Sequence, residues 1–373
     1  MHDRKRVTPA DIPHLTFGCA ILGTGGGGGV TSAALSASAA LREHGDVPLV
    51  TLDELPQDGL VLPLGAIGAP TVSGEMLPSG REAALIRDTV EQTLGKPVVA
   101  VMASEIGGGN GVEPVALAAS LGLPLLDADG MGRAFPEVQM VSMYVAGRDP
   151  GLVVMADVQG NVATLRPVDG LWSEALARAV CVAMGSTAIM ADYVLTAGEM
   201  RGAVIEGTPS RAIALGRAVE GAADPVEALR AELGAVSLIT GKLVDIERRT
   251  GGGFVRGSVV IEGIGECKGR LLRIEIQNEN LVALEDGRVR ASVPDLISIV
   301  DNQTAEAIST ESLRYGMRVM VLAWPCAPLW RTSAGLRTAG PAAFGYDIDY
   351  IPVEECGEAA SPVAAQGEKG ARP

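Results

Sequence analysis

Histidine, aromatic residues and cysteine are all scarce in this sequence of 373 residues. The only histidines are His2, His14 and His44, all near the start of the chain. A zinc or iron site commonly needs two or three imidazoles close together, so we expect no metal centre. The five cysteines are scattered without a CxxC pair, which predicts a reduced, cytoplasmic protein. Aromatic residues make up 3% of the chain, so the core must consist of aliphatic side chains.

Positive charge and long hydrophobic runs are also limited. The chain carries 30 Lys and Arg against 45 Asp and Glu, a formal net charge of −15. This charge repels phosphate backbones and anionic lipid surfaces. No stretch has the length and purity of a membrane-spanning helix, and the start "MHDRKRVTPADIPHLT" lacks the apolar run of a signal peptide. We therefore expect neither nucleic acid nor a membrane as partner.

Three segments differ in their residue patterns. Residues 1–170 alternate between short apolar runs and amphipathic stretches, which predicts a three-layer α/β domain. Residues 171–355 begin with helical tracts to about residue 233 and continue as alternating, turn-punctuated strands. This pattern predicts a helical bridge followed by an antiparallel β-rich domain, either a barrel or a sandwich. Residues 356–373 have the composition of a disordered tail.

Glycine is abundant, and the stretch "GCAILGTGGGGGV" (residues 18–30) places five glycines in a row. The G-x-G-x-x-G match within it follows a helix-like segment and has no trailing Lys-Ser/Thr, so we expect no nucleotide cofactor. Glycines are required where the backbone approaches another group closely. We expect Gly25, Gly26 and Gly27 to contact a bound small molecule, although packing alone is an alternative.

The segment "ASEIGGGNG" (residues 103–111) ends an apolar run that is typical of a buried parallel strand. Ligands bind at the carboxyl ends of such strands. We therefore interpret Glu105 as a catalytic acid or base, with Gly108 and Asn110 binding the substrate. The alternative is that Glu105 only caps the next helix.

The segment "DADGMGRAFPE" (residues 127–137) concentrates charge at the end of the next strand. Asp127 and Asp129 are predicted to share one face and to act as catalytic acids. Arg133 and Glu137 are predicted to bind the substrate, and we expect Glu105, Asp127, Asp129 and Arg133 to lie in one cleft. The alternatives are a structural ion pair with Arg133 and a metal site at the two aspartates, which the lack of a nearby imidazole disfavours.

The late segment "LAWPCAPLWRTSAGLRTAGPAAFGYDIDY" (residues 322–350) is rich in Pro, Trp, Arg and Gly. Cys326 is a candidate nucleophile, because nearby arginines lower a thiol pKa, or else a small buried hydrophobe. Arg331 and Tyr346 are candidate substrate ligands. We expect residues 325–346 to face the glycine loops and to close the cleft.

Taken in order and spacing, these motifs resemble the S-methyl thiohydantoin desulfurase family over residues 8–354. The resemblance implies a hydrolase that acts on a small hydantoin-like ring, releasing a thiol from the ring C2 carbon, and we expect no cofactor. The alternative is an auxiliary subunit that works with a hydantoinase- or oxoprolinase-type enzyme. We expect a homo-oligomer.

Overall fold

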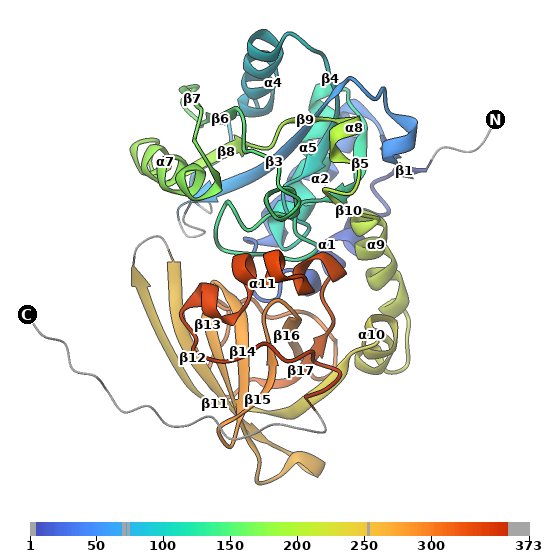
Figure 1. Ribbon diagram of the computed structural model, residues 1–373. Coiled ribbons are helices and arrows are strands. Elements are labelled where there is room, and N and C mark those ends of the chain that lie inside the picture. The colour runs from blue at the N-terminus through green and yellow to red at the C-terminus, as the bar shows by residue number, and fades with distance from the viewer. Residues whose placement is uncertain (1–4, 69–71, 73–74, 252–253, 357–373) are drawn as a thin grey trace, which may run out of the picture.

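Two sheets organise the described part of the chain. The structure is a computed structural model, and it describes residues 5–68, 72, 75–251 and 254–356. A mixed α/β region comes first, and a curled antiparallel sheet follows it in the lower half of Figure 1. The predicted fold class is thus confirmed, with the β-rich part forming a half-barrel. The predicted tail lies outside the described residues from 357 on.

Within the described residues, the first sheet has ten strands in the order β1-β2-β5-β4-β3-β8-β6-β7, with β10 beside β5 and β9 beside β3. The pairs β2–β5, β4–β5 and β3–β4 are parallel, and the other pairs are antiparallel. The strands are β1 Arg6–Val7, β2 Val47–Val50, β3 Leu60–Gly68, β4 Val98–Ala103, β5 Leu125–Asp129, β6 Val153–Ala156, β7 Val162–Leu165, β8 Thr187–Ala191, β9 Leu195–Thr196 and β10 Ile205–Glu206.

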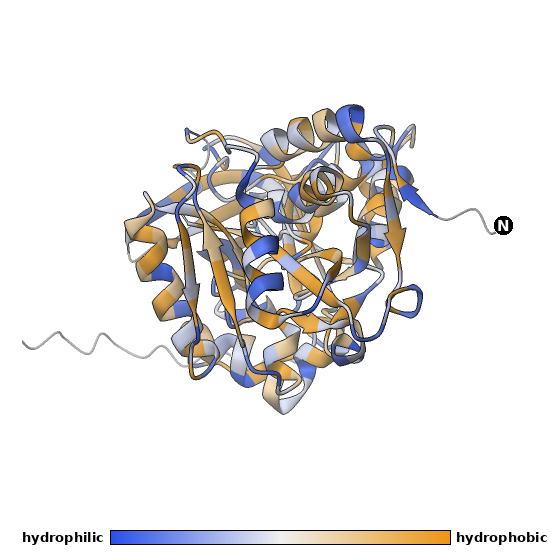
Figure 2. Ribbon diagram, turned by 90° about the horizontal axis from the view of Figure 1, so that it is seen from above, coloured by the Kyte–Doolittle hydropathy of each residue, from blue (hydrophilic) through white to orange (hydrophobic). Residues whose placement is uncertain are grey.

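Helices surround this sheet. Seen from above, the strands are mainly hydrophobic, whereas the helices alternate between hydrophobic and hydrophilic residues (Figure 2). The helices are α1 Ile12–Leu22, α2 Val30–His44, α4 Glu82–Leu94, α5 Gly109–Leu121, α6 Ser142–Val145, α7 Gly170–Ala183, α8 Ala197–Met200, α9 Thr208–Val219 and α10 Pro225–Leu233, with a 3-10 turn at Leu52–Glu54. Among the described residues, no helix combines the length and apolar character needed to cross a bilayer.

The segment after α7 differs from the helical tract expected there. It contains β8, β9 and β10, all of which join the first sheet, so that sheet continues past residue 170. Gly185 and Ser186 have positive φ values of 89° and 68°, which ends α7 and turns the chain into β8. The apolar residues of β8 then pair with β3 and β6.

In the described part of the chain, the second sheet has seven strands in the order β15-β14-β13-β12-β11-β17-β16, all antiparallel. Its strands are β11 Val236–Gly251, β12 Phe254–Gly263, β13 Leu271–Gln277, β14 Glu279–Glu285, β15 Arg288–Ser292, β16 Leu296–Asp301 and β17 Arg318–Trp324. Short helical segments lie at Gly265–Cys267, Pro328–Arg331 and Pro341–Phe344, and α11 spans Ser333–Ala339. In Figure 1, α11 lies between the two sheets, and α9 and α10 run along one side.

The glycine-rich stretch lies at the junction of the two regions. Asn280 N donates to Thr24 O (2.8 Å), and Thr310 N donates to Gly25 O (2.9 Å). Ser298 Oγ donates to Ile21 O, at the end of α1 (2.7 Å). The main hydrophobic core also includes residues of both regions. The second sheet therefore docks directly on the segment that carries the glycines.

A Gly27→Ala change tests why these glycines are needed. Gly27 has a φ of +81°, and a Cβ there would lie 2.2 Å from Gly107 O. We expect it to lower the free energy of unfolding by about 1–3 kcal/mol, from overpacking and left-handed strain. Gly29→Ala is the matched control, because a Cβ there meets nothing within 4 Å and its φ is −70°. Equal urea midpoints for the two variants would contradict the close-approach explanation.

Candidate functional site

A cavity of about 510 Å³ lies where the two regions meet. The first region contributes the ends of β3 and β4, the start of α2, the first turns of α5 and strand β8. The second region contributes Asn278, Glu279 and Glu311. This volume suits a small-molecule ligand.

Glu105 occupies the wall directly beyond β4. The parallel strand ends at Ala103, so the chain turns here toward α5, which begins at Gly109. Asn110 Nδ2 donates to Glu105 Oε1 (2.6 Å), and Phe135 N donates to Oε2 (3.2 Å). Glu105 is only 6% exposed, and burial raises its pKa from 4.5 to about 8. Glu105 therefore holds a proton at neutral pH and can exchange it with a ligand.

The cavity wall is strongly acidic. Burial raises the pKa of Asp192 to about 7, and burial together with the charge of Glu82 raises that of Glu113 to about 7. Among the described residues, no group of His, Cys, Asp or Glu is arranged to hold a metal ion. The carboxyl groups that line the cavity belong to Glu82, Glu105, Glu113, Glu137, Asp192, Glu279 and Glu311.

Arg178 is the one basic residue among the described residues that line this cavity. Its guanidinium donates to both carboxylate oxygens of Glu174, at 2.7 and 3.0 Å. It also stacks over the ring of Phe254, 5.3 Å from the centroid. Its charge is thus already paired, and the wall favours a ligand that is positively charged or rich in N–H donors.

The two glycine-rich segments contact each other through their backbones. Gly108 N donates to Cys19 O (2.7 Å), Gly109 N to Gly28 O (3.1 Å) and Asn110 N to Gly27 O (3.1 Å). The first amides of α5 are therefore already engaged. Gly28, Gly29 and Ser32 line the cavity at the start of α2, whose first N–H groups have no side-chain cap.

Asp129 and Arg133 lie beside residues of the cavity wall without lining it. Asp129 Oδ2 accepts from the N–H groups of Ile106, Met131 and Gly132, at 2.7–2.9 Å. Arg133, 1% exposed, donates to Ala134 O (3.0 Å) and Thr24 Oγ1 (2.9 Å). These contacts hold the loops after β4 and β5 together behind Glu105.

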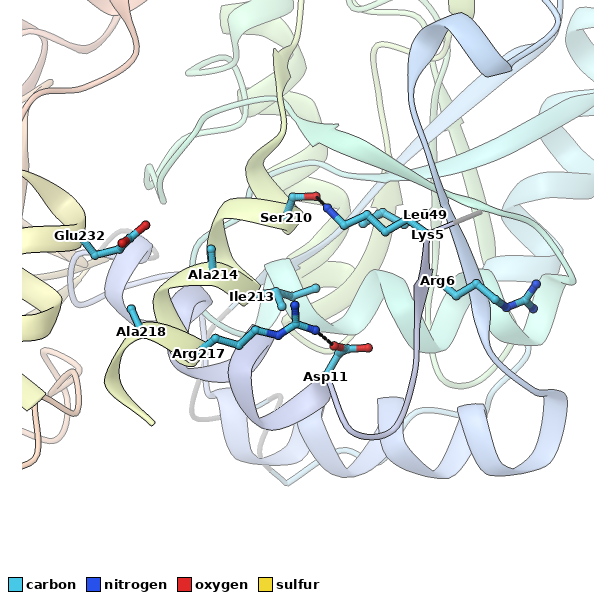
Figure 3. A pocket seen from close by; sticks show the side chains of 10 residues that line it. All are labelled: Lys5, Arg6, Asp11, Leu49, Ser210, Ile213, Ala214, Arg217, Ala218 and Glu232. Carbon is cyan, nitrogen blue, oxygen red and sulfur yellow. Dashed lines mark hydrogen bonds and ion pairs between the residues drawn. The ribbon is translucent and has the colours of Figure 1, made fainter. Parts of the chain in front are cut away.

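Asp127 faces a different part of the molecule. It accepts hydrogen bonds from the backbone N (2.9 Å) and the hydroxyl of Ser210, in the first turn of α9. Ser210 lines a second hollow together with Lys5 and Arg217 (Figure 3). Lys5 Nζ donates to Ser210 Oγ (2.5 Å), and Arg217 pairs with Asp11. The structure therefore places Asp127 at the start of α9 and outside the acidic cavity.

The segment 322–350 contacts residues of the cavity wall through Trp330. Trp330 Nε1 donates to Met131 O (2.8 Å), and its ring packs edge-on against Phe135 at 4.9 Å. Phe135 lines the cavity, whereas Cys326, Arg331 and Tyr346 do not. Burial raises the pKa of the Cys326 thiol, so it is protonated. Arg331 instead pairs with Asp295 and Glu354.

Of the residues proposed from the sequence, the structure groups five around the cavity. These are Gly26, Gly27, Glu105, Asn110 and Glu137. The others, which do not line it, are Gly25, Gly108, Asp127, Asp129, Arg133, Cys326, Arg331 and Tyr346.

Sequence reasoning missed Glu279, which is the first residue of β14. The available signal was the run "QNEN" (residues 277–280), four polar residues that interrupt the apolar alternation of two strands. Gln277, Glu279 and Asn280 are all buried. Buried polar runs of this kind are costly and indicate a site or a network.

Comparison with known proteins adds the family. A model of the S-Me-THD-like N-terminal domain matches residues 10–167, and a model of the S-Me-THD-like C-terminal domain matches residues 168–353. An X-ray crystal structure of a protein from Chromobacterium violaceum is similar, with a TM-score of 0.77 and 26% identity. The similarity covers 94% of this chain and 100% of that one. A search of curated proteins finds no match.

Proposed function

Because the chain belongs to the S-Me-THD-like family, we propose that it hydrolyses the C2–S bond of a small S-alkylated thiohydantoin ring. The products are a hydantoin and a thiol. The observation that carries the proposal is Glu105, a carboxyl group that is protonated at neutral pH and lines an acidic cavity.

The chemistry needs activation of a cyclic isothiourea. Protonation of its ring nitrogen makes C2 electrophilic and gives the ring a positive charge. The acidic wall stabilises that charge as it develops, which is the interaction that accelerates a reaction. Glu105 gives the proton to the nitrogen, and its carboxylate then takes a proton from the water that attacks C2. We propose that the first amides of α2, which have no side-chain cap, bind a ring carbonyl.

The direct test is thiol release from an S-methyl thiohydantoin by the purified chain, followed with a thiol-reactive dye. We expect turnover by this chain alone. Turnover that appears only after a hydantoinase-type protein is added would support the auxiliary-subunit alternative instead.

The pH dependence of this turnover follows from Glu105. Its protonated form activates the ring, and its pKa lies at about 8. We expect kcat/KM to fall as the pH rises through about 8, because the acid loses its proton. Rates of thiol release between pH 6 and 10, in a buffer series of constant ionic strength, measure this. A profile that rises through that range would contradict an acid role for Glu105.

A further inference from the structure

A second buried carboxyl group reaches the cavity from the other sheet. Glu279 begins β14 and is 2% exposed. Among the described residues its Oε2 has no hydrogen-bond partner. A buried, unpartnered carboxylate oxygen is unfavourable unless a ligand or a proton satisfies it.

The glycine-rich stretch makes room for this side chain. A Cβ on Gly26 would lie 2.0 Å from Glu279 Oε1 and 2.6 Å from its Cδ. The neighbouring bond from Asn280 N to Thr24 O (2.8 Å) fixes the two segments against each other. Because Gly26 has no side chain, a carboxyl group of the second region can enter a cavity whose wall comes mainly from the first region.

The charge of one buried arginine acts on both carboxyl groups. Arg133 donates to the carbonyls of Pro294 (2.9 Å) and Asp295 (3.0 Å), and its charge favours the ionised forms of both Glu105 and Glu279. Burial is the main cause that raises the pKa of Glu279, and the negative charges of Glu105 and Glu311 raise it further. The negative charge of Asp129 likewise raises the pKa of Glu105. A single fixed positive charge stabilises one carboxylate, which leaves the other protonated.

We propose that Glu105 and Glu279 are an acid–base pair that spans the two domains and shares one proton. The proposal rests on the hydrolysis proposed above and deepens it. It makes the second domain a contributor of a catalytic residue.

The pair accounts for every proton of the reaction. The carboxylic acid gives its proton to the ring nitrogen while the carboxylate takes one from the attacking water, and the C2–O bond forms. The two groups then exchange roles. The newly protonated carboxyl gives its proton to sulfur as the C2–S bond breaks, and the other takes the proton of the C2 hydroxyl as the carbonyl forms. The thiol leaves, and the pair returns to its starting state.

The test compares Glu105→Gln, Glu279→Gln and the double variant in the thiol-release assay. We expect each single variant to lower kcat about 100-fold or more, with KM changed less than about threefold. The double variant should be less than about tenfold slower than either single variant, because the pair acts as one unit. Glu275→Gln is the matched control, since Glu275 lies on β13 and pairs with Arg273 outside the cavity. Its kcat should equal that of the wild type.

The wild-type pH profile tests the pair without any variant. A pair with one proton predicts a bell-shaped profile with two limbs, whereas a single acid predicts only the fall at high pH. A one-limbed profile, or full activity of Glu279→Gln when Glu105→Gln is inactive, would overturn the pair and leave the hydrolysis intact. Absence of thiol release by the wild type would overturn the hydrolysis itself.

Discussion

The Glu105→Gln protein is expected to release thiol roughly 10²–10⁴-fold more slowly than the wild type, while remaining folded. Glutamine keeps the size of the side chain and its acceptor oxygen for Asn110, but it carries no exchangeable acidic proton. Asp127→Asn is the control. It changes the same kind of group on the neighbouring strand, but that group lies at the start of α9. Its turnover should stay within about threefold of the wild type, and comparable losses in both variants would contradict the assignment of Glu105.

A stability measurement separates loss of chemistry from loss of folding. The pKa of Glu105 is raised on folding, from 4.5 to about 8. Its contribution to stability is therefore complete below pH 4.5 and is lost as the pH rises to about 8. The glutamine variant does not ionise. Its melting temperature relative to the wild type should thus increase between pH 5 and 8 and then level off. A difference that does not change with pH would show that Glu105 is ionised throughout.

The second large effect is expected at Arg331, in stability and not in catalysis. Arg331 donates to Asp295 at 2.8 Å and to Glu354 at 2.8 Å. Asp295 is fully buried and also accepts from Tyr350 (2.9 Å) and the N–H of Val353 (2.9 Å). Arg331→Met leaves the Asp295 charge without its cation, which should lower the free energy of unfolding by about 3–5 kcal/mol. Urea denaturation measures this.

Two companion variants show whether the ion pair is the cause. Arg331→Lys keeps the charge and loses the planar fork, so its loss should be smaller than that of Arg331→Met. The double variant Asp295→Asn/Arg331→Met should recover part of the loss, because no unpaired charge stays buried. The kcat/KM of the Arg331→Lys protein should equal that of the wild type, since Arg331 does not line the cavity. A weakened KM with unchanged stability would instead make Arg331 a substrate ligand.

The sequence alone predicted the order of the two regions and placed Glu105 just after a buried parallel strand. The apolar run of β4 and the glycines after it are local features, and they predict a parallel strand that ends in a loop. The resemblance to the family is likewise carried by short motifs. Each of these features depends on residues within about ten positions of one another in the chain.

The tertiary structure alone decided which side chains meet. Asp127 contacts Ser210, 83 positions later, and Glu279 reaches a cavity that Glu105 also lines. Hydrophobic periodicity in the sequence predicts neither contact, because each depends on how helices and sheets dock after they have formed. The glycines at residues 25–28 show the same division. Their composition predicts close approach, but only the docking of the second sheet reveals that Gly26 makes room for a carboxyl group of the other region.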